Sequence, residues 1–217
     1  MSTLQIPRIE MKARQFVTQF QYFILATLFV MSGWTSRALA QVGHSHSIPP
    51  QHSQMTSDQQ TKASALVNIV RQSTERFKDV SEAENAGYAL IFGCVSGDDA
   101  GAMGLHYLNG ALLDDVNKNG IFYADRPQIV IYEPTTNGSV RLLGADYLVF
   151  ADAWKAKHPE GPPQLMGQAF HLFESPNRFA LPAFYTLHVW AWKDNPNGAF
   201  VNWHPNVSCQ SFPSPIP

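Results

Sequence analysis

The chain has 217 residues, of which 45% are apolar, 12% aromatic and 15% charged, values typical of a globular protein rather than a disordered or fibrous one. Its net charge of -2 provides no excess of cations that would neutralise several phosphates, so we expect no nucleic-acid partner. The length fits one domain with a substantial core.

The first forty residues have the pattern of a secretory signal peptide. Three basic residues precede an apolar stretch over 22–34, and Ala38 and Ala40 are the small residues that a signal peptidase reads. The apolar stretch is shorter than the roughly 20 residues that a membrane-spanning helix needs. We therefore predict a signal peptide at 1–40, a periplasmic or secreted mature protein, and no integral membrane segment after cleavage.

Residues 41–56 are polar, lack an apolar period and are rich in His, Ser and Pro, so we expect a flexible leader there. The imidazoles of His44, His46 and His52 can chelate Zn, Cu or Ni weakly, although a solvated tail is the simpler interpretation. Residues 57–217 are then predicted to form a single α+β domain.

Two helices are predicted at the start of this domain. Ser57 and Gln60 have the spacing of a capping box, and apolar residues at helical intervals predict an amphipathic helix to about residue 79. Ser81 and Glu84 repeat that spacing, and Gly87 favours a left-handed stop. A second, short helix is therefore expected before residue 87.

From residue 88 onwards the pattern indicates strands. Residues 89–95 form an apolar run, 97–104 are expected to be a glycine-rich loop, and 105–108 a short strand that carries His106. A last strand is expected from about 184 to 192, in which His188 shares a face with large aromatic rings. Both faces of that strand are apolar, which predicts burial on both.

The clearest hairpin joins residues 128–135 to 140–150 through Asn137-Gly138, a strong turn signal. A two-residue turn at this position pairs Ile129 with Asp146, Ile131 with Gly144 and Glu133 with Leu142. Alternation then places the Asp146 carboxylate on an apolar face. It needs a partner there, because an unpaired buried charge costs several kcal/mol.

The two cysteines, Cys94 and Cys209, are expected to form one disulfide in an oxidising compartment. A thiolate metal pair is the alternative, but no CxxC spacing supports it. The predicted fold class is α+β, with amino-terminal helices packed on an antiparallel β-sheet or a partial β-barrel and one disulfide.

Four segments together resemble a family of uncharacterised exported bacterial proteins: GAMGLHY at 101–107, LLGADYLVF, LHVWAWKDNPNGAF and the closing NVSC. The likeness covers roughly residues 65 to 209, and the family offers no activity to transfer. In that family the position of Asp146 more often holds Glu, and that of His204 more often Asn. The resemblance thus implies a carboxylate role at position 146 and no metal role for His204.

The residues best suited to chemistry are His106, Asp146 and His188, with His171 as a fourth candidate. Neutral imidazoles and a carboxylate that project from separate strands suit Zn, Cu, Mn or Fe. The simpler alternative is a buried His hydrogen-bonded to an Asp with no ion. Glu133 is too far along its strand to share an ion with Asp146.

Two other features are weaker. Residues 115–120 match the opening half of a calcium-binding EF-hand loop, but Arg126 occupies the position of the bidentate carboxylate, which favours a turn between strands at Asn119-Gly120. Trp190, Trp192 and Trp203 suit either a core or a pocket for a flat ligand such as a sugar, and the core is the simpler interpretation.

Three functions follow as hypotheses. The first is an exported protein that binds a transition metal or a small ligand in a His/Asp-lined pocket. The second is a metal-dependent enzyme that uses the same residues with one coordination position open to water or substrate. The third is a structural or envelope-associated protein without a site.

Overall fold

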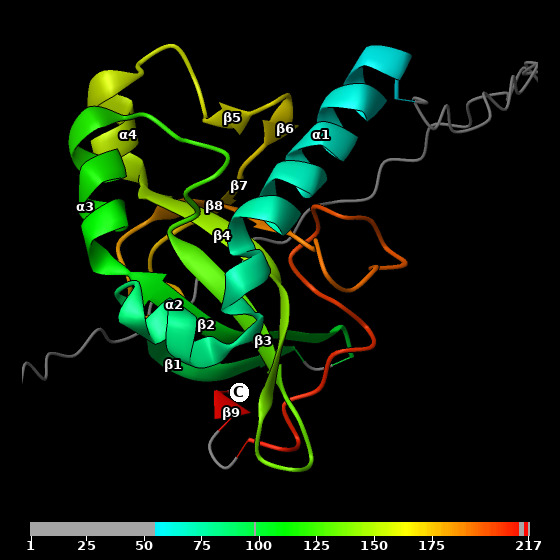
Figure 1. Cartoon of the computed structure of the whole chain (residues 1–217). Coiled ribbons are helices and arrows are strands. Elements are labelled where there is room, and N and C mark those ends of the chain that lie inside the picture. Colours follow the sequence, from blue (N-terminus) through cyan, green and yellow to red (C-terminus); the bar gives the residue numbers. More distant parts are fainter. Residues whose placement is uncertain (1–54, 98, 213–214, 217) are drawn as a thin grey trace, which may run out of the picture. The chain divides into compact units, whose positions relative to one another are not determined.

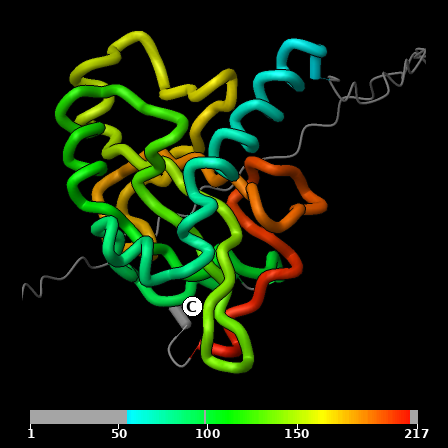
Figure 2. The backbone as a smooth tube through the Cα atoms, viewed as in Figure 1, coloured from blue at the N-terminus to red at the C-terminus, as the bar shows by residue number. Residues whose placement is uncertain are grey.

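The computed structural model describes residues 55–97, 99–212 and 215–216 (Figures 1 and 2). The chain divides into two units, Met1–Pro49 and Pro50–Pro217, and all described residues lie in the second. The predicted signal peptide, most of the predicted leader and its three histidines lie outside the described residues. Over the part that is described, no helix combines the length and apolar character needed to cross a membrane.

The described unit combines helices with a large sheet. Its elements in chain order are α1 (Ser57–Thr74), the 3-10 helix η1 (Glu75–Lys78), α2 (Val80–Asn85), β1 (Tyr88–Gly97), β2 (Gly101–Asn109), α3 (Gly110–Asn119), β3 (Ile129–Pro134), β4 (Val140–Phe150), α4 (Ala151–Lys157), β5 (Gln164–Leu165), β6 (Gln168–Ala169), β7 (His171–Phe173), β8 (Phe184–Val189) and β9 (Pro215–Ile216).

Seven strands form one sheet in the order β7-β8-β4-β3-β2-β1-β9. The first six pair antiparallel, and β9 adds in parallel to β1. The six antiparallel strands curl into a half-barrel, and β5 and β6 form a separate small hairpin. The predicted α+β fold with helices on an antiparallel, partly closed sheet is therefore confirmed.

The two faces of the sheet bury different sets of side chains. On β4, Tyr147 and Val149 face a core that includes Leu66 and Val70 of α1 and Trp154 of α4. Helices α1, α3 and α4 cover this outer face (Figure 1). The alternate residues of β4 and β8 point to the opposite, inner face of the half-barrel. As predicted from its composition, β8 is buried on both faces.

The helix starts differ from the prediction by one or two residues. The capping box of α1 uses Thr56 and Gln59. The Thr56 backbone amide donates to Gln59 Oε1 at 2.8 Å, and the Gln59 backbone amide donates to Thr56 Oγ1 at 3.2 Å. The predicted Ser57 and Gln60 box is therefore wrong. Helix α2 is capped by the carboxylate of Asp79, which accepts from the Ser81 backbone amide at 3.0 Å, so Ser81 is not the cap. Gly87 adopts the expected left-handed conformation, with φ of 91°.

The loop predictions between residues 97 and 120 need correction. Strand β1 extends to Gly97 and β2 begins at Gly101, so the expected glycine-rich loop is much shorter. Residues 115–119 belong to helix α3, and Gly120 ends this helix in a left-handed conformation. Both the calcium loop and the turn between strands are therefore wrong. The Asp115 carboxylate accepts from the Asn119 side chain within the helix at 2.7 Å.

The hairpin between β3 and β4 reaches the predicted register near the site by a different route. Pro134 pairs with Val140, and the Thr135 backbone amide donates to the Ser139 carbonyl at 2.9 Å, so the turn contains three residues rather than two. A bulge at Leu143 then shifts the register back by one residue.

Because the bulge compensates for the longer turn, the predicted pairs of Ile129 with Asp146 and of Ile131 with Gly144 are confirmed. The predicted pair of Glu133 with Leu142 is wrong, since Glu133 pairs with Arg141 beyond the bulge. Gly144 permits the close approach of β8, where a Cβ atom would collide with the Val189 carbonyl oxygen.

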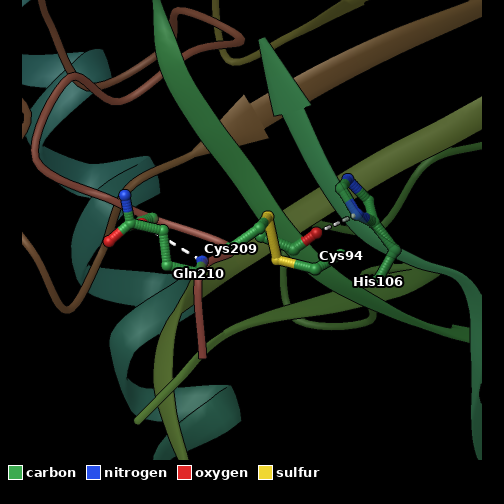
Figure 3. The surroundings of a disulfide bond; sticks show 6 residues. Cys94, His106, Cys209 and Gln210 are labelled. Atoms are coloured by element: carbon green, nitrogen blue, oxygen red, sulfur yellow. Dashed lines mark hydrogen bonds between the residues drawn. A yellow bond between two sulfur atoms is a disulfide. The ribbon is translucent and has the colours of Figure 1, made fainter. Parts of the chain in front are cut away.

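The segment after β8, orange to red in Figure 2, returns across the sheet. Strand β8 was predicted to extend to Trp192, but it ends at Val189. The Trp192 amide instead donates to the Leu143 carbonyl at 2.9 Å. His204 forms an isolated bridge with Ala102. The disulfide between Cys94 and Cys209, with Cα atoms 5.6 Å apart, then ties this segment to β1, as predicted (Figure 3).

Removal of the disulfide is expected to destabilise the fold. The bond closes a loop of 115 residues. The chain-entropy model predicts that such a bond stabilises the folded state by about 4 to 5 kcal/mol, and the removal of native disulfides typically costs about 2 to 5 kcal/mol. A Cys94→Ala, Cys209→Ala double variant should therefore lose about 2 to 5 kcal/mol in urea denaturation. Unchanged unfolding midpoints in the oxidised wild type and the variant would contradict this expectation.

Candidate metal centre

Three polar side chains from three different strands meet on the inner face of the half-barrel. His106 lies on β2, Asp146 on β4 and His188 on β8, and all three are at least 95% buried. Asp146 and His188 are directly opposite each other across the strand pair. One potential ligand atom from each of the three residues lies within 4.8 Å of the other two.

The meeting of His106 with His188 depends on the curl of the sheet. Strands β3 and β4 lie between β2 and β8, so in a flat sheet the outer two would be about 14 Å apart. The Nε2 atoms of the two rings are nevertheless 3.4 Å apart, and the ring planes are nearly perpendicular. The inner face is therefore concave at this point, and both side chains point into it.

The Asp146 carboxylate is held by groups of the neighbouring strand β8. Its Oδ1 atom accepts hydrogen bonds from the Thr186 hydroxyl at 2.5 Å and from the Leu187 backbone amide at 3.1 Å. Burial raises the pKa of Asp146 to about 6, although the nearby His106 and these hydrogen bonds oppose the rise. The carboxylate is thus ionised at neutral pH.

Both imidazoles are neutral at neutral pH. Burial, reinforced by the neighbouring His188, lowers the pKa of His106 to about 4. Burial also lowers the pKa of His188 to about 3, and only the side chain of Asn202 acts against that shift. At pH 7 the three buried groups therefore carry one negative charge, on Asp146, and no positive charge that would balance it.

The hydrogen atoms of two neutral imidazoles cannot satisfy all of these contacts. A neutral imidazole has one N–H donor and one acceptor nitrogen. If His106 Nδ1 donates to the Gly104 carbonyl at 3.2 Å, then His188 Nε2 must donate to His106 Nε2. The acceptor Nδ1 of His188 then faces the Asp146 carboxylate, also an acceptor, at 3.7 Å.

The reverse arrangement creates the same conflict at the other end. If His106 Nε2 donates to His188 Nε2, the acceptor Nδ1 of His106 faces the Gly104 carbonyl oxygen at 3.2 Å. By distance, both His188 Nδ1 and Asn202 Oδ1 are buried without a hydrogen-bond partner, and the Asn202 side chain is a further polar group that acts on His188. The conflict disappears when a cation lies between the two Nε2 atoms, because both Nδ1 atoms then carry hydrogen.

A proton and a metal ion are the two cations that can occupy this position. The depressed pKa values of both rings disfavour a shared proton at neutral pH. Two nitrogens bound to one tetrahedral zinc ion at its usual bond lengths lie about 3.3 to 3.4 Å apart, which matches the 3.4 Å spacing observed. Two imidazoles and one carboxylate form a ligand set for such ions.

A small cavity adjoins the three side chains. Its floor consists of His106, Asp146, Thr186 and His188, and its walls are apolar. The wall residues are Phe92, Met103, Ile129, Leu148, Phe173, Phe179, Leu181 and Phe184. The group can therefore hold a metal ion at the end of an apolar chamber.

His171 is not brought into this group. Its side chain is exposed on β7, and its Nε2 atom lies 3.3 Å from the Phe200 carbonyl oxygen. His204 also lies elsewhere, with Nε2 at 3.1 Å from the Asp194 carbonyl. Glu133 pairs with Arg141 and with Lys193, the latter at 2.7 Å, and shares nothing with Asp146. The predicted separation of Glu133 from the site is thus observed.

The tryptophans do not line the cavity. Trp190 is 2% exposed and donates to the Val201 carbonyl at 2.6 Å. Trp192 donates to the Thr74 hydroxyl at 3.0 Å, with the Lys78 ammonium above its ring. Trp203 packs over Gly97. The simpler interpretation of these rings, as packing residues, agrees with their positions.

Sequence reasoning missed Thr186 and the aromatic residues around the cavity. Thr186 lies two residues before His188 on the predicted last strand, so strand alternation places both side chains on the same face. Phe179 lies in the β7–β8 connection, where no periodicity places a side chain.

No family model, curated protein or solved structure matches this chain.

The two buried imidazoles make the stability of the metal-free protein depend on pH. The pKa values of His106 and His188 lie below their ordinary 6.5 in the folded chain, so the unfolded chain binds more protons between about pH 4 and 6.5. The free energy of unfolding should rise over this range, by up to about 1.4 kcal/mol per pH unit for each ring. Asp146, with its raised pKa, opposes part of the rise below pH 6.

Urea denaturation at a series of pH values, with a chelator present, measures this rise. In a His106→Gln, His188→Gln double variant the curve should be flatter between pH 4 and pH 6.5, because the two groups that gain protons on unfolding are absent. Parallel curves for the variant and the wild type would show that neither ring is buried in its neutral form.

Proposed function

We propose that this domain binds a divalent transition metal ion, zinc by preference, through His106, Asp146 and His188, in an exported protein. The observation that carries the proposal is the convergence of the three buried side chains, with the two Nε2 atoms 3.4 Å apart, the spacing of two nitrogens bound to one tetrahedral zinc ion. A divalent ion also balances the charge of the buried Asp146 carboxylate. Export is supported by the signal-peptide pattern and by the Cys94–Cys209 disulfide.

Contacts beyond the ligands support the same proposal. Metal-bound histidines commonly donate their second N–H to a carbonyl or carboxylate, which fixes the ring. The Gly104 carbonyl is placed to accept from His106 Nδ1. Thr186 orients Asp146 in turn. These contacts correspond to the second layer of a metal site.

A metal-dependent enzyme is the second candidate, and the cavity favours it. Catalytic zinc sites use three protein ligands and keep a fourth position for water or substrate. A chamber with apolar walls adjoins the three side chains here, and a water or substrate in it would supply the fourth ligand. In such an enzyme the ion would lower the pKa of a bound water, while the walls limit the access of bulk solvent.

Metal titration of the purified chain tests the proposal. Calorimetry with Zn²⁺ should give one equivalent per chain, and replacement by Co²⁺ should give the visible absorption of a tetrahedral ion. His106→Gln, His188→Gln and Asp146→Asn should each weaken binding roughly 100-fold or more, because each removes a ligand. His171→Gln should leave the affinity unchanged, since that ring is bonded outside the group.

Thr186→Val provides a finer test, because it removes the hydroxyl that orients Asp146 and keeps the side-chain shape. Affinity should fall roughly 10- to 100-fold. Thr136→Val, at an exposed position in the hairpin turn, is the matched control and should bind as the wild type does. Wild-type protein that binds less than a tenth of an equivalent of any metal would overturn the proposal.

A further inference from the structure

The cavity above the proposed metal site separates its polar and apolar residues. The four polar lining side chains, His106, Asp146, Thr186 and His188, lie close to one another. The other lining residues are apolar, and none of the described residues that line it is Lys or Arg. In the metal-free protein a carboxylate or phosphate would find no positive side chain here, so the lining then favours an uncharged ligand.

The size of the cavity limits the ligand further. The space open to the centre of a water molecule is about 20 Å³, whereas a single water needs roughly 10 to 15 Å³ by the same measure. There is room for a molecule of two or three heavy atoms. Sugars, peptides and nucleotides are too large.

The outer end of the cavity is closed by interlocked aromatic rings. Phe179 contacts Phe92, Phe173 and Phe184, with ring centroids between 5.3 and 5.9 Å apart. Phe92, Phe173 and Phe179 are half-buried, whereas the polar floor is buried. The chamber therefore approaches the surface at this aromatic rim.

Two local structures fix the rim. Asn177 bonds to the backbone on both sides of Phe179, donating to the carbonyls of Glu174 and Leu181 and accepting from the amides of Phe179 and Leu181. On the other side, Phe92 adopts a left-handed conformation with φ of 62°, within an irregularity of β1. Such a conformation is unfavourable for a residue other than glycine. Both segments are held so that their rings meet over the chamber.

We infer that this chamber receives one small uncharged molecule, of the size of dioxygen or carbon dioxide, and places it against His106, Asp146 and His188. The inference rests on the proposed function for the role of the ion, but the chamber itself requires no metal. Its apolar walls admit the molecule, and its size excludes larger ones. The polar floor is where a bound ion would meet it.

Xenon is a suitable probe, because it is uncharged and binds small apolar cavities. The metal-free chain, with labelled methyl groups, is titrated with xenon and followed by NMR. Saturable shifts are expected at the methyl groups of Met103, Ile129 and Leu148, which line the chamber. Benzene should produce no such shifts. Xenon shifts that do not saturate, or saturable binding of benzene, would overturn the inference.

A filled chamber supplies the second measurement. Leu181→Phe adds volume at the half-buried rim and should weaken xenon binding roughly tenfold or more, because the added ring occupies the space. Leu172→Phe makes the same change at an exposed position of β7 and should bind xenon as the wild type does. Equal xenon binding by the two variants would contradict the assignment of the chamber.

This measurement is independent of the metal titration. A chain that binds xenon in the chamber but no zinc would overturn the proposed metal function and leave the chamber in place. A chain that binds zinc at His106, Asp146 and His188 but no xenon would overturn only the inference about the small molecule.

Discussion

The candidate site depends on the curvature of one antiparallel sheet. His106 and His188 are separated by two intervening strands, yet their Nε2 atoms are 3.4 Å apart. Only a sheet that bends toward its inner face brings the two rings together. Helices α1, α3 and α4 pack on the outer face, and the residues that alternate with Asp146 on β4 belong to that core. The burial of the outer face and the convergence of polar groups on the inner face are thus two results of one bent sheet.

The electrostatics of the site follow from this burial. Desolvation keeps both imidazoles neutral, while the hydrogen bonds to Asp146 offset part of the cost of its charge. A hydrogen-bonded pair of one His and one Asp would satisfy itself in a core. Here a second imidazole competes for the same hydrogen atoms, and His188 Nδ1 has no hydrogen-bond partner at an ordinary distance, with Asn202 as a further polar neighbour. The incomplete pairing is the difference between this group and an ordinary buried His–Asp contact.

Sequence patterns predicted the parts of the site more reliably than their arrangement. Alternation placed Asp146 and His188 on apolar faces, because the period of a strand is local information. Their direct pairing across β4 and β8 and the approach of His106 depend on strand order and curvature, which no local pattern contains. Helix α3 was missed because Asn119-Gly120 was interpreted as a turn between strands, although Gly also ends helices in the left-handed conformation. His171 was included from its residue type alone.

The bulge at Leu143 separates the exposed hairpin tip from the candidate site. A slip of one residue along β4 would move Asp146 from the inner face of the sheet to the face that the helices cover. The carboxylate would then lie in the apolar core around Tyr147 instead of beside His188. The additional residue on β4 absorbs the odd length of the turn before the strand reaches position 146. Variation in turn length can therefore be accommodated locally, and the chemistry of the interior is insulated from evolutionary change at the surface loop.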